Sequence, residues 1–395
     1  MPGMAPDETS ASSAGVADSS PLGGEVPGEA GRRGHDWSAL RDEFPLLDRC
    51  VYLNACSLGP LPRSGMAALQ QYARTWDEIG TPAWYSDWLP LLARLRSRIE
   101  ELLGAPAGSV AVVPNASTAL STLASCLPRQ SDRIVIRPDD FPTDGHQWLS
   151  RPEVAVEFRD YDPLDGVGLV CTTHVVFGTG EVRDAAAICA AARGAGATSL
   201  IDGYHACGSV PIDVVAMGCD AYVGGCLKWL SGGPGTAFLY VRPDLIPSLR
   251  PVGTGWFATR EPFSFSTERL DFADDARRFE GGTWPIPAHY AALAGLELVL
   301  SVGVPAIAAR LRDLTGRMIE QAREAGFEVL TTAHTRSGMV AIACPRGEEV
   351  EARLLERGVV IDSRPGRVRV SPHWSMGEEE VDRGMALVLE ELRRA

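Results

Sequence analysis

A single lysine is the residue with the clearest capacity for covalent chemistry in this sequence. The chain holds 37 lysine and arginine residues, and all of them except Lys228 are arginine. Arginine keeps its proton in proteins and cannot form an imine with an aldehyde, whereas lysine can. Lys228 stands between two glycine-rich turns and beside the apolar residues Leu227, Trp229 and Leu230, so a solvated surface lysine is the weaker interpretation. We therefore expect Lys228 to form a Schiff base.

Asp202 and Phe141 each follow an apolar run that is typical of a buried strand. The carboxyl ends of parallel strands meet at one crevice, where ligands bind. There a carboxylate could pair with a protonated ring nitrogen, and an aromatic side chain could stack on a planar ring. The alternatives are that Asp202 caps the next turn and that Phe141 belongs to the core.

Asn115, Ser117 and Thr118 stand at the start of a predicted helix. The free backbone N–H groups and the dipole at such an end favour a phosphate. Asn115 would suffice as a plain N-cap, so anion binding and simple capping remain equal alternatives. An imine lysine, a carboxylate, a stacking surface and a phosphate cradle together match pyridoxal 5'-phosphate. The lysine would hold this cofactor and then move the α proton of an amino acid.

Short apolar strands alternate with helices between residues 109 and 241. This alternation predicts an α/β fold whose mainly parallel sheet is covered by helices on both faces. We expect its strands at residues 110–113, 134–136, 154–158, 168–172, 199–201, 221–223 and 236–241.

We divide the chain at residues 35 and 300. Residues 1–35 are mostly Gly, Ala, Ser, Pro and acidic residues, which predicts a disordered tail without a secretory signal. Residues 36–300 form the large cofactor-binding domain, with its N-terminal segment. A long helix from residue 288 to about 325 leads into a small C-terminal α+β domain at residues 301–395.

Charge and cysteine usage narrow the function classes. The net charge of -14 argues against nucleic acid or an anionic membrane as a partner, and no apolar run approaches a membrane span. The nine cysteines show no C-x-x-C pair, which favours a reducing, cytoplasmic setting. We predict no metal site.

Two motifs give the chain a specific resemblance. Residues 200–208 (LIDGYHACG) and 224–235 (GGCLKWLSGGPG) resemble the class V aminotransferase superfamily of pyridoxal phosphate enzymes, fold type I, over roughly residues 45–390. Within that superfamily, further pieces are similar to kynureninases: residues 54–60, 141–144, 255–257 and 369–372. The resemblance implies a large domain with a seven-stranded sheet and a homodimer whose active sites are completed across the interface.

The resemblance also implies a role for each candidate residue. Lys228, Asp202 and His205 would be catalytic, with Phe141 stacked on the pyridine ring and Asp202 on its nitrogen. The remaining cofactor contacts would come from Ser117, Thr118, Asp144, Trp256, Gly282 and Thr283, the last two reaching the phosphate of the opposite subunit. The substrate would contact Asn54, Ser57 and Arg369, whose guanidinium suits a carboxylate; an exposed strand face is the alternative for Arg369.

Two features depart from the pattern, and one is that the substrate asparagine of kynureninases, expected near residues 283–285, is not evident. Kynureninases place a tyrosine just before the lysine and desulfurases a histidine, whereas this chain has Leu227. The loop in which desulfurases carry a persulfide cysteine holds no cysteine here. The leading prediction is a lyase that cleaves a C–S or C–C bond in the side chain of an amino acid, in specialised metabolism. The alternatives are an aminotransferase of the same fold and, from another class, a non-catalytic ligand-binding protein.

Overall fold

The sheet that carries the candidate residues has seven strands. The computed structural model describes residues 35–395, so the predicted tail lies, except for its last residue, outside the described range. The strands of this sheet and of two smaller sheets are β1 (Val51–Tyr52), β2 (Val110–Val113), β3 (Arg133–Ile136), β4 (Ala155–Phe158), β5 (Leu169–Thr173), β6 (Thr198–Asp202), β7 (Ala221–Gly225), β8 (Ala237–Val241), β9 (Val340–Ala343), β10 (Val359–Val360), β11 (Asp362–Arg364) and β12 (Arg367–Val370).

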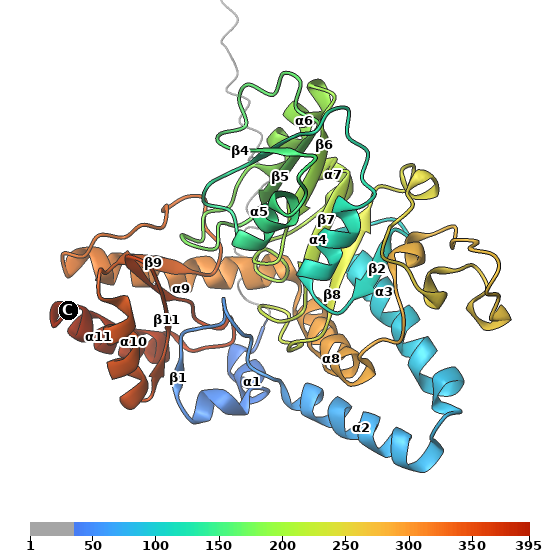
Figure 1. Cartoon of the computed structure of the whole chain (residues 1–395). Helices are drawn as coiled ribbons and strands as arrows, with labels where there is room; N and C mark the ends of the chain where they lie inside the picture. The colour runs from blue at the N-terminus through green and yellow to red at the C-terminus, as the bar shows by residue number, and fades with distance from the viewer. Residues whose placement is uncertain (1–34) are drawn as a thin grey trace, which may run out of the picture. The chain divides into compact units, whose positions relative to one another are not determined.

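The helices alternate with these strands as the sequence predicts. They are α1 (Trp37–Asp42), α2 (Arg63–Ile79), α3 (Leu89–Leu103), α4 (Ala116–Ala124), α5 (Pro142–Leu149), α6 (Ala185–Gly194), α7 (Val214–Met217), α8 (Ile286–Val302), α9 (Val304–Glu324), α10 (Gly347–Glu356) and α11 (Glu378–Arg393). The order of strands in the large sheet is β2-β8-β7-β6-β5-β3-β4. Only β8 runs antiparallel to its neighbours, which confirms the expected mainly parallel sheet (Figure 1).

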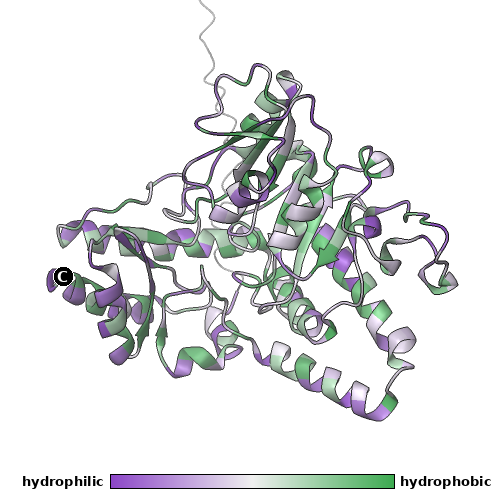
Figure 2. Ribbon diagram, viewed as in Figure 1, coloured by the Kyte–Doolittle hydropathy of each residue, from purple (hydrophilic) through white to green (hydrophobic). Residues whose placement is uncertain are grey.

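Both faces of this sheet are buried, and the alternation along β2 shows how. Val110 and Val112 belong to the core on one face, with α3, α8 and α9. Ala111 and Val113 belong to the core on the other face, with α4 and α5. Apolar residues therefore fill successive positions of each strand, as a doubly covered sheet requires, and the strands form the apolar interior in Figure 2.

The C-terminal part of the chain builds smaller sheets that include an N-terminal strand. β11, β12 and β9 form an antiparallel sheet, whereas β1 pairs in parallel with β10. An isolated bridge between Asn54 and Ser371 extends this second pairing. Figure 1 shows β1 beside the C-terminal strands, away from the helices that follow it in sequence. Nothing in this arrangement tests the predicted division at residue 300, which stays a prediction.

The long helix predicted for residues 288 to about 325 is wrong in one respect. It is two helices, α8 and α9, which meet at an angle of 81°. Gly303 separates them with a φ of 86°, a left-handed conformation that ends a helix and favours glycine. Pro305 then lies in the first turn of α9, where its missing N–H is harmless. Within residues 35–395, no single helix is long and apolar enough to cross a membrane, although this bent pair passes the same test when joined.

Helix α8 presses directly on the turn that contains Lys228, which gives a stability prediction. A Cβ at Gly295 would lie 2.2 Å from the backbone oxygen of Leu230. Gly295→Ala should therefore destabilise the protein by roughly 2 kcal/mol or more, although alanine is the better helix former. Gly316→Ala in α9 is the matched control, because its nearest atom is the end of the Arg336 side chain at 3.3 Å. Urea unfolding of both variants measures the difference; equal midpoints would contradict the close approach.

Candidate active site

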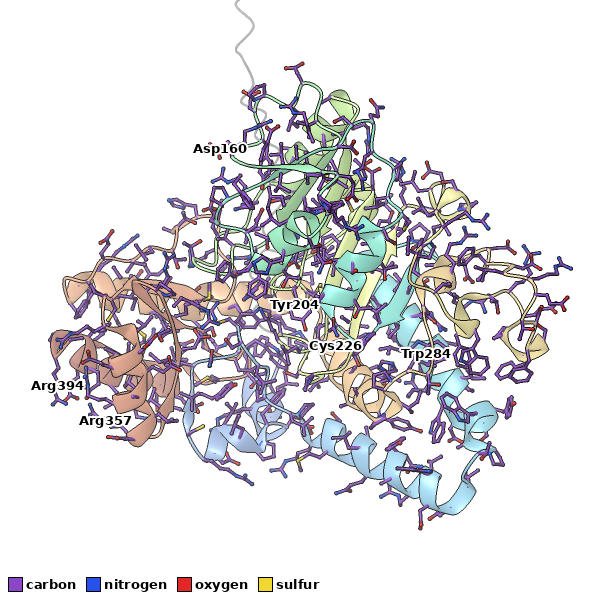
Figure 3. All side chains as sticks on the ribbon, in the orientation of Figure 1. Asp160, Tyr204, Cys226, Trp284, Arg357 and Arg394 are labelled. Carbon is purple, nitrogen blue, oxygen red and sulfur yellow. The ribbon has the colours of Figure 1, made fainter. Side chains whose placement is uncertain are left out.

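Lys228 and His205 meet at the buried ends of two neighbouring strands, where the cofactor pocket is expected. Lys228 lies in the turn after β7 and His205 in the turn after β6, and Lys228 Nζ forms a short hydrogen bond with His205 Nε2. The ring of Tyr204 lies 5.2 Å from the same Nζ, and Figure 3 labels this tyrosine near the middle of the molecule. Lys228 is only 9% exposed. The structure therefore brings together the predicted imine lysine and the predicted histidine.

Burial shifts both groups toward their neutral forms. Loss of water lowers the pKa of Lys228 to about 7, an effect to which the positive charge of Arg369 adds. Burial, followed by the charge of Lys228, lowers the pKa of His205 well below its ordinary value. A neutral amine is the form that attacks an aldehyde. Lys228 is thus prepared for imine formation in a way that an exposed lysine is not.

The kynureninase-like segment 54–60 lies against the Lys228 turn. The Gly59 N–H donates to the Leu227 carbonyl at 3.0 Å, and a Cβ at Gly59 would lie 1.9 Å from the Lys228 backbone oxygen. Only glycine fits there. At the other end of the segment, Asn54 Nδ2 donates to the Ile361 carbonyl at 3.4 Å. The segment therefore connects the Lys228 turn to the C-terminal strands.

Two carboxylates lie close together beside this pocket. Asp202 ends β6, and its Oδ1 accepts the Tyr204 N–H at 2.8 Å, which is the capping contact that the sequence left open. Burial raises the pKa of Asp202 to about 6. Asp144 in α5 is fully buried, yet neither of its oxygens has a hydrogen-bond partner. Burial and the charge of Asp202 raise the pKa of Asp144 well above its ordinary value.

An unpartnered buried carboxylate needs an explanation, because nearly all buried polar groups in proteins are paired. The protonated nitrogen of a pyridine ring could donate a hydrogen bond to the carboxylates of Asp144 and Asp202. Phe141 lies at the start of α5, 41% exposed, with its ring edge-on to Phe177 at 5.3 Å. It is therefore not a core residue. The residues of this pocket fit the cofactor that the sequence predicts.

The start of α4 shows both of the expected features. Asn115 Oδ1 accepts the Thr118 N–H at 2.8 Å and the Thr118 hydroxyl at 3.1 Å, so the N-cap is confirmed. Ser117 is exposed. Helix α4 packs on β7 and β8, and the Lys228 turn follows β7 in the same sheet. Phosphate binding by Ser117 and Thr118 stays a prediction.

Arg369 is buried rather than open. It is 1% exposed; its Nε and Nη2 hold the two carboxylate oxygens of Asp362. Nη1 donates to the Phe177 carbonyl at 2.6 Å and Nη2 to Ser57 Oγ at 3.1 Å. Four of the five N–H groups of a guanidinium are therefore engaged within the protein. Arg364 lies 3.2 Å from the same Asp362 carboxylate.

Trp256 lies on a segment that contacts the segment of Gly282 and Thr283. The Phe257 N–H donates to the Gly281 carbonyl at 3.3 Å, which joins the two segments, and Trp256 is 39% exposed. Gly282 and Thr283 are exposed. Among residues 35–395, no hydrogen bond joins this group to Lys228, Asp202 or His205. Cofactor binding by Trp256, Gly282 and Thr283 stays a prediction.

Sequence reasoning missed Asp362 and Asp140, the acidic partners of two arginines at the site. Asp362 faces Arg369 across the antiparallel pair β11–β12. Pro365-Gly366, a common turn dipeptide, lies between these strands and could have revealed the hairpin and its charge pair. Asp140 forms an ion pair with Arg183, which is distant in sequence, so no local pattern predicted this pair.

The comparisons with known proteins agree with this geometry. The model of the family described as aminotransferase class-V matches residues 164–381. The chain is 33% identical to a kynureninase of Deinococcus radiodurans, over 89% of this chain and 93% of that protein. It is 31% identical to a Bacillus subtilis protein described as the uncharacterized aminotransferase YcbU, over 86% and 94%.

Solved structures show the same fold. The apo cysteine desulfurase of Thermococcus onnurineus NA1 has a TM-score of 0.82 at 19% identity, covering 90% of this chain and 98% of the other. A complex of the cystine C–S lyase C-DES with its product cysteine persulfide has a TM-score of 0.80 at 22% identity, covering 88% and 99%. The fold and site thus define a pyridoxal phosphate enzyme of fold type I. The chain belongs to the class V aminotransferase family, as the motifs around Asp202 and Lys228 predicted, and pyridoxal 5'-phosphate is its cofactor.

The pKa of Lys228 gives a prediction about cofactor uptake. The rate at which the apoprotein forms its visible absorption with pyridoxal phosphate should rise with pH and level off above about 7, because the amine is then neutral. An ordinary lysine would keep gaining rate up to about pH 10. Stopped-flow absorption between pH 6 and 9 measures this, with Lys228→Ala as the control without a visible band. A rate still rising steeply at pH 9 would contradict the pKa.

The second prediction concerns Asp202. Asp202→Asn should retain the cofactor but lose at least about 100-fold in turnover, because an amide does not hold a ring nitrogen protonated. Cofactor content by absorption and turnover on the best substrate measure the two effects. Unimpaired turnover would mean that Asp202 serves only as the cap of the Tyr204 turn.

Proposed function

We propose that the protein is a lyase that cleaves a bond in the side chain of an amino acid. The bond is either the C–S bond of a cysteine conjugate or a C–C bond of the kind that kynureninases cleave. When bound, pyridoxal phosphate withdraws electrons from the α carbon of its amino acid. Lys228 would hold it, Phe141 would stack on its ring, and Asp202 with Asp144 would keep its ring nitrogen protonated.

The observation that carries the proposal is the hydrogen bond between Lys228 and His205. It places two groups that can accept a proton side by side in a buried pocket. Removal of an α proton needs one base, whereas cleavage further along the side chain also needs a proton moved at the atoms of the broken bond. The second group therefore favours a lyase.

Two further observations support this choice. Kynureninases of several bacteria are 30–33% identical to this chain over 83–89% of its length, and the fold neighbours include a cystine C–S lyase. Leu227, which is half-buried, is the exception, because a contact that kynureninases make from that position is missing here. An aminotransferase, the alternative, would share Lys228 and Asp202 with a lyase.

We also propose a cytoplasmic homodimer. All nine cysteines are free and seven of them are buried, which suits a reducing compartment. Gly282 and Thr283 are exposed, which suits residues that complete the site of a partner subunit. The mass of the protein in solution tests the dimer.

The test of the lyase is to incubate the holoenzyme with L-kynurenine and with a set of cysteine S-conjugates. Release of alanine would identify C–C cleavage, and release of pyruvate with a thiol would identify C–S cleavage. A 2-oxo acid formed in equal amount to the amine form of the cofactor, without cleavage, would establish an aminotransferase instead.

The role of His205 is tested in the same assay. His205→Asn should lose about 100-fold in cleavage while α-proton exchange with deuterated water continues, because Lys228 remains. Lys228→Ala should lose both. If His205→Asn cleaves at the wild-type rate, the hydrogen bond that carries the proposal has no part in the chemistry.

A further inference from the structure

Three carboxylates gather behind the candidate cofactor pocket. Asp140, Asp144 and Asp202 come from the turn after β3, from α5 and from the end of β6. Burial raises the pKa of each, and the negative charge of Asp140 raises the pKa of the other two further. The positive charge of Arg183 opposes this at Asp140 and Asp144. One arginine therefore balances a cluster of buried acids.

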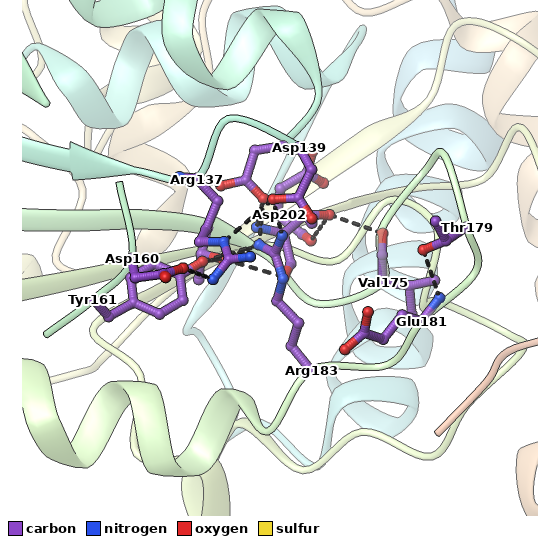
Figure 4. A network of polar contacts seen from close by, with 12 residues as sticks. Arg137, Asp139, Asp160, Tyr161, Val175, Thr179, Glu181, Arg183 and Asp202 are labelled. Carbon is purple, nitrogen blue, oxygen red and sulfur yellow. Dashed lines mark hydrogen bonds and ion pairs between the residues drawn. The ribbon is translucent and has the colours of Figure 1, made fainter. Parts of the chain in front are cut away.

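Arg183 reaches this cluster from the segment before α6 and is almost fully covered, with its side chain 8% exposed. It forms an ion pair with the Asp140 carboxylate and donates to Asp139 Oδ1 at 2.7 Å. It also donates to the Tyr161 hydroxyl at 2.9 Å and to Thr172 Oγ1 at 2.7 Å. Figure 4 shows its guanidinium between Asp139 and Tyr161. These partners follow β3, follow β4 and lie on β5, so one side chain joins three adjacent strands.

Asp140 connects Arg183 to the predicted cofactor residues. Its Oδ1 accepts the Thr173 N–H at 3.1 Å, and its Oδ2 accepts the Arg137 N–H at 3.0 Å. The next residue is Phe141, and the Asp144 N–H donates to the Phe141 carbonyl at 2.9 Å. The position of Asp140 therefore sets the start of the turn from which both Phe141 and Asp144 project.

We propose that Arg183 is a positioning residue of the cofactor site. With Asp140 it fixes the turn that carries Phe141 and Asp144, and its charge balances the carboxylates that face the ring nitrogen. The inference concerns how the protein holds pyridoxal phosphate, so it applies equally to a lyase and to an aminotransferase.

Two substitutions separate positioning from charge. Arg183→Gln and Asp140→Asn each break the same ion pair, so both should weaken cofactor binding, by about tenfold in Kd. Their charges are opposite. The imine between Lys228 and the cofactor loses a positive charge when it deprotonates. Removal of the Arg183 cation should therefore raise the pH of this deprotonation by about half a unit, and removal of the Asp140 anion should lower it by a similar amount.

Arg137→Gln is the matched control. Arg137 pairs with Asp139 at 3.3 Å and with Asp160 in the same network (Figure 4), but its side chain is 32% exposed and solvent screens its charge. Its contact with Asp140 is made by the backbone, which the substitution retains. This variant should leave both the affinity for pyridoxal phosphate and the pH of the absorption change within error of the wild type.

The experiment titrates apoprotein with pyridoxal phosphate and then titrates the visible absorption of each holoprotein with acid and base. Opposite pH shifts in Arg183→Gln and Asp140→Asn, with weaker binding in both, would support the proposal. Wild-type affinity and an unmoved titration in Arg183→Gln would overturn it. If Arg183→Gln does not fold, Arg183→Lys carries the test: it keeps the charge but not the planar fork. It should bind the cofactor less tightly and titrate as the wild type does, and unchanged binding would overturn the positioning role.

Discussion

Removal of water from ionisable groups is the constraint on which the rest of this site depends. Burial is the largest cause of the pKa shifts of Lys228, His205, Asp202 and Asp144. It pushes the basic groups toward neutrality, which imine formation requires, and it raises the pKa of the two acids, which a cationic ring nitrogen beside them would lower again. Such groups cost stability when they lie unpaired, and their gathering in one pocket is typical of a functional site. The fold retains them because a ligand supplies the missing partners.

The sheet makes this burial possible by allowing backbones to approach closely. A Cβ at Gly203, directly after Asp202, would lie 1.9 Å from the Tyr222 hydroxyl. Tyr222 in turn bonds His174 Nδ1 at 3.0 Å, beneath the end of β6. A side chain at Gly203 would push the turn that carries His205 away from Lys228. The distance between the histidine and the lysine is thus set by residues that carry no chemistry themselves.

The sequence predicted well what depends on local pattern and poorly what depends on distant contacts. Short apolar runs gave the seven strands, and the composition alone singled out Lys228, since one lysine among many arginines is informative at any fold. The break at Gly303 was missed because the apolar pattern continues across it on both sides. Asp362 was missed because its partner, Arg369, lies across a hairpin. Asp362 binds the same guanidinium for which the sequence predicted a contact with the substrate. Arg183 was missed because nothing in its local sequence indicates its partner. Only the sheet order, which places β3 beside β5, brings Arg183 close to Asp140.

The pairing of β1 with β10 has a consequence for the order in which the protein acquires its structure. Asn54 bonds a residue 307 positions later in the chain, so this contact cannot form before the C-terminal strands have been synthesised. The seven-stranded sheet contains only residues 110–241 and can assemble before that moment. Because closing so long a loop is slow, we expect the N-terminal segment to settle on the Lys228 turn after the sheet has formed. A chain in which this contact has not formed would leave that side of the Lys228 turn uncovered, so the full burial of the lysine would be completed late.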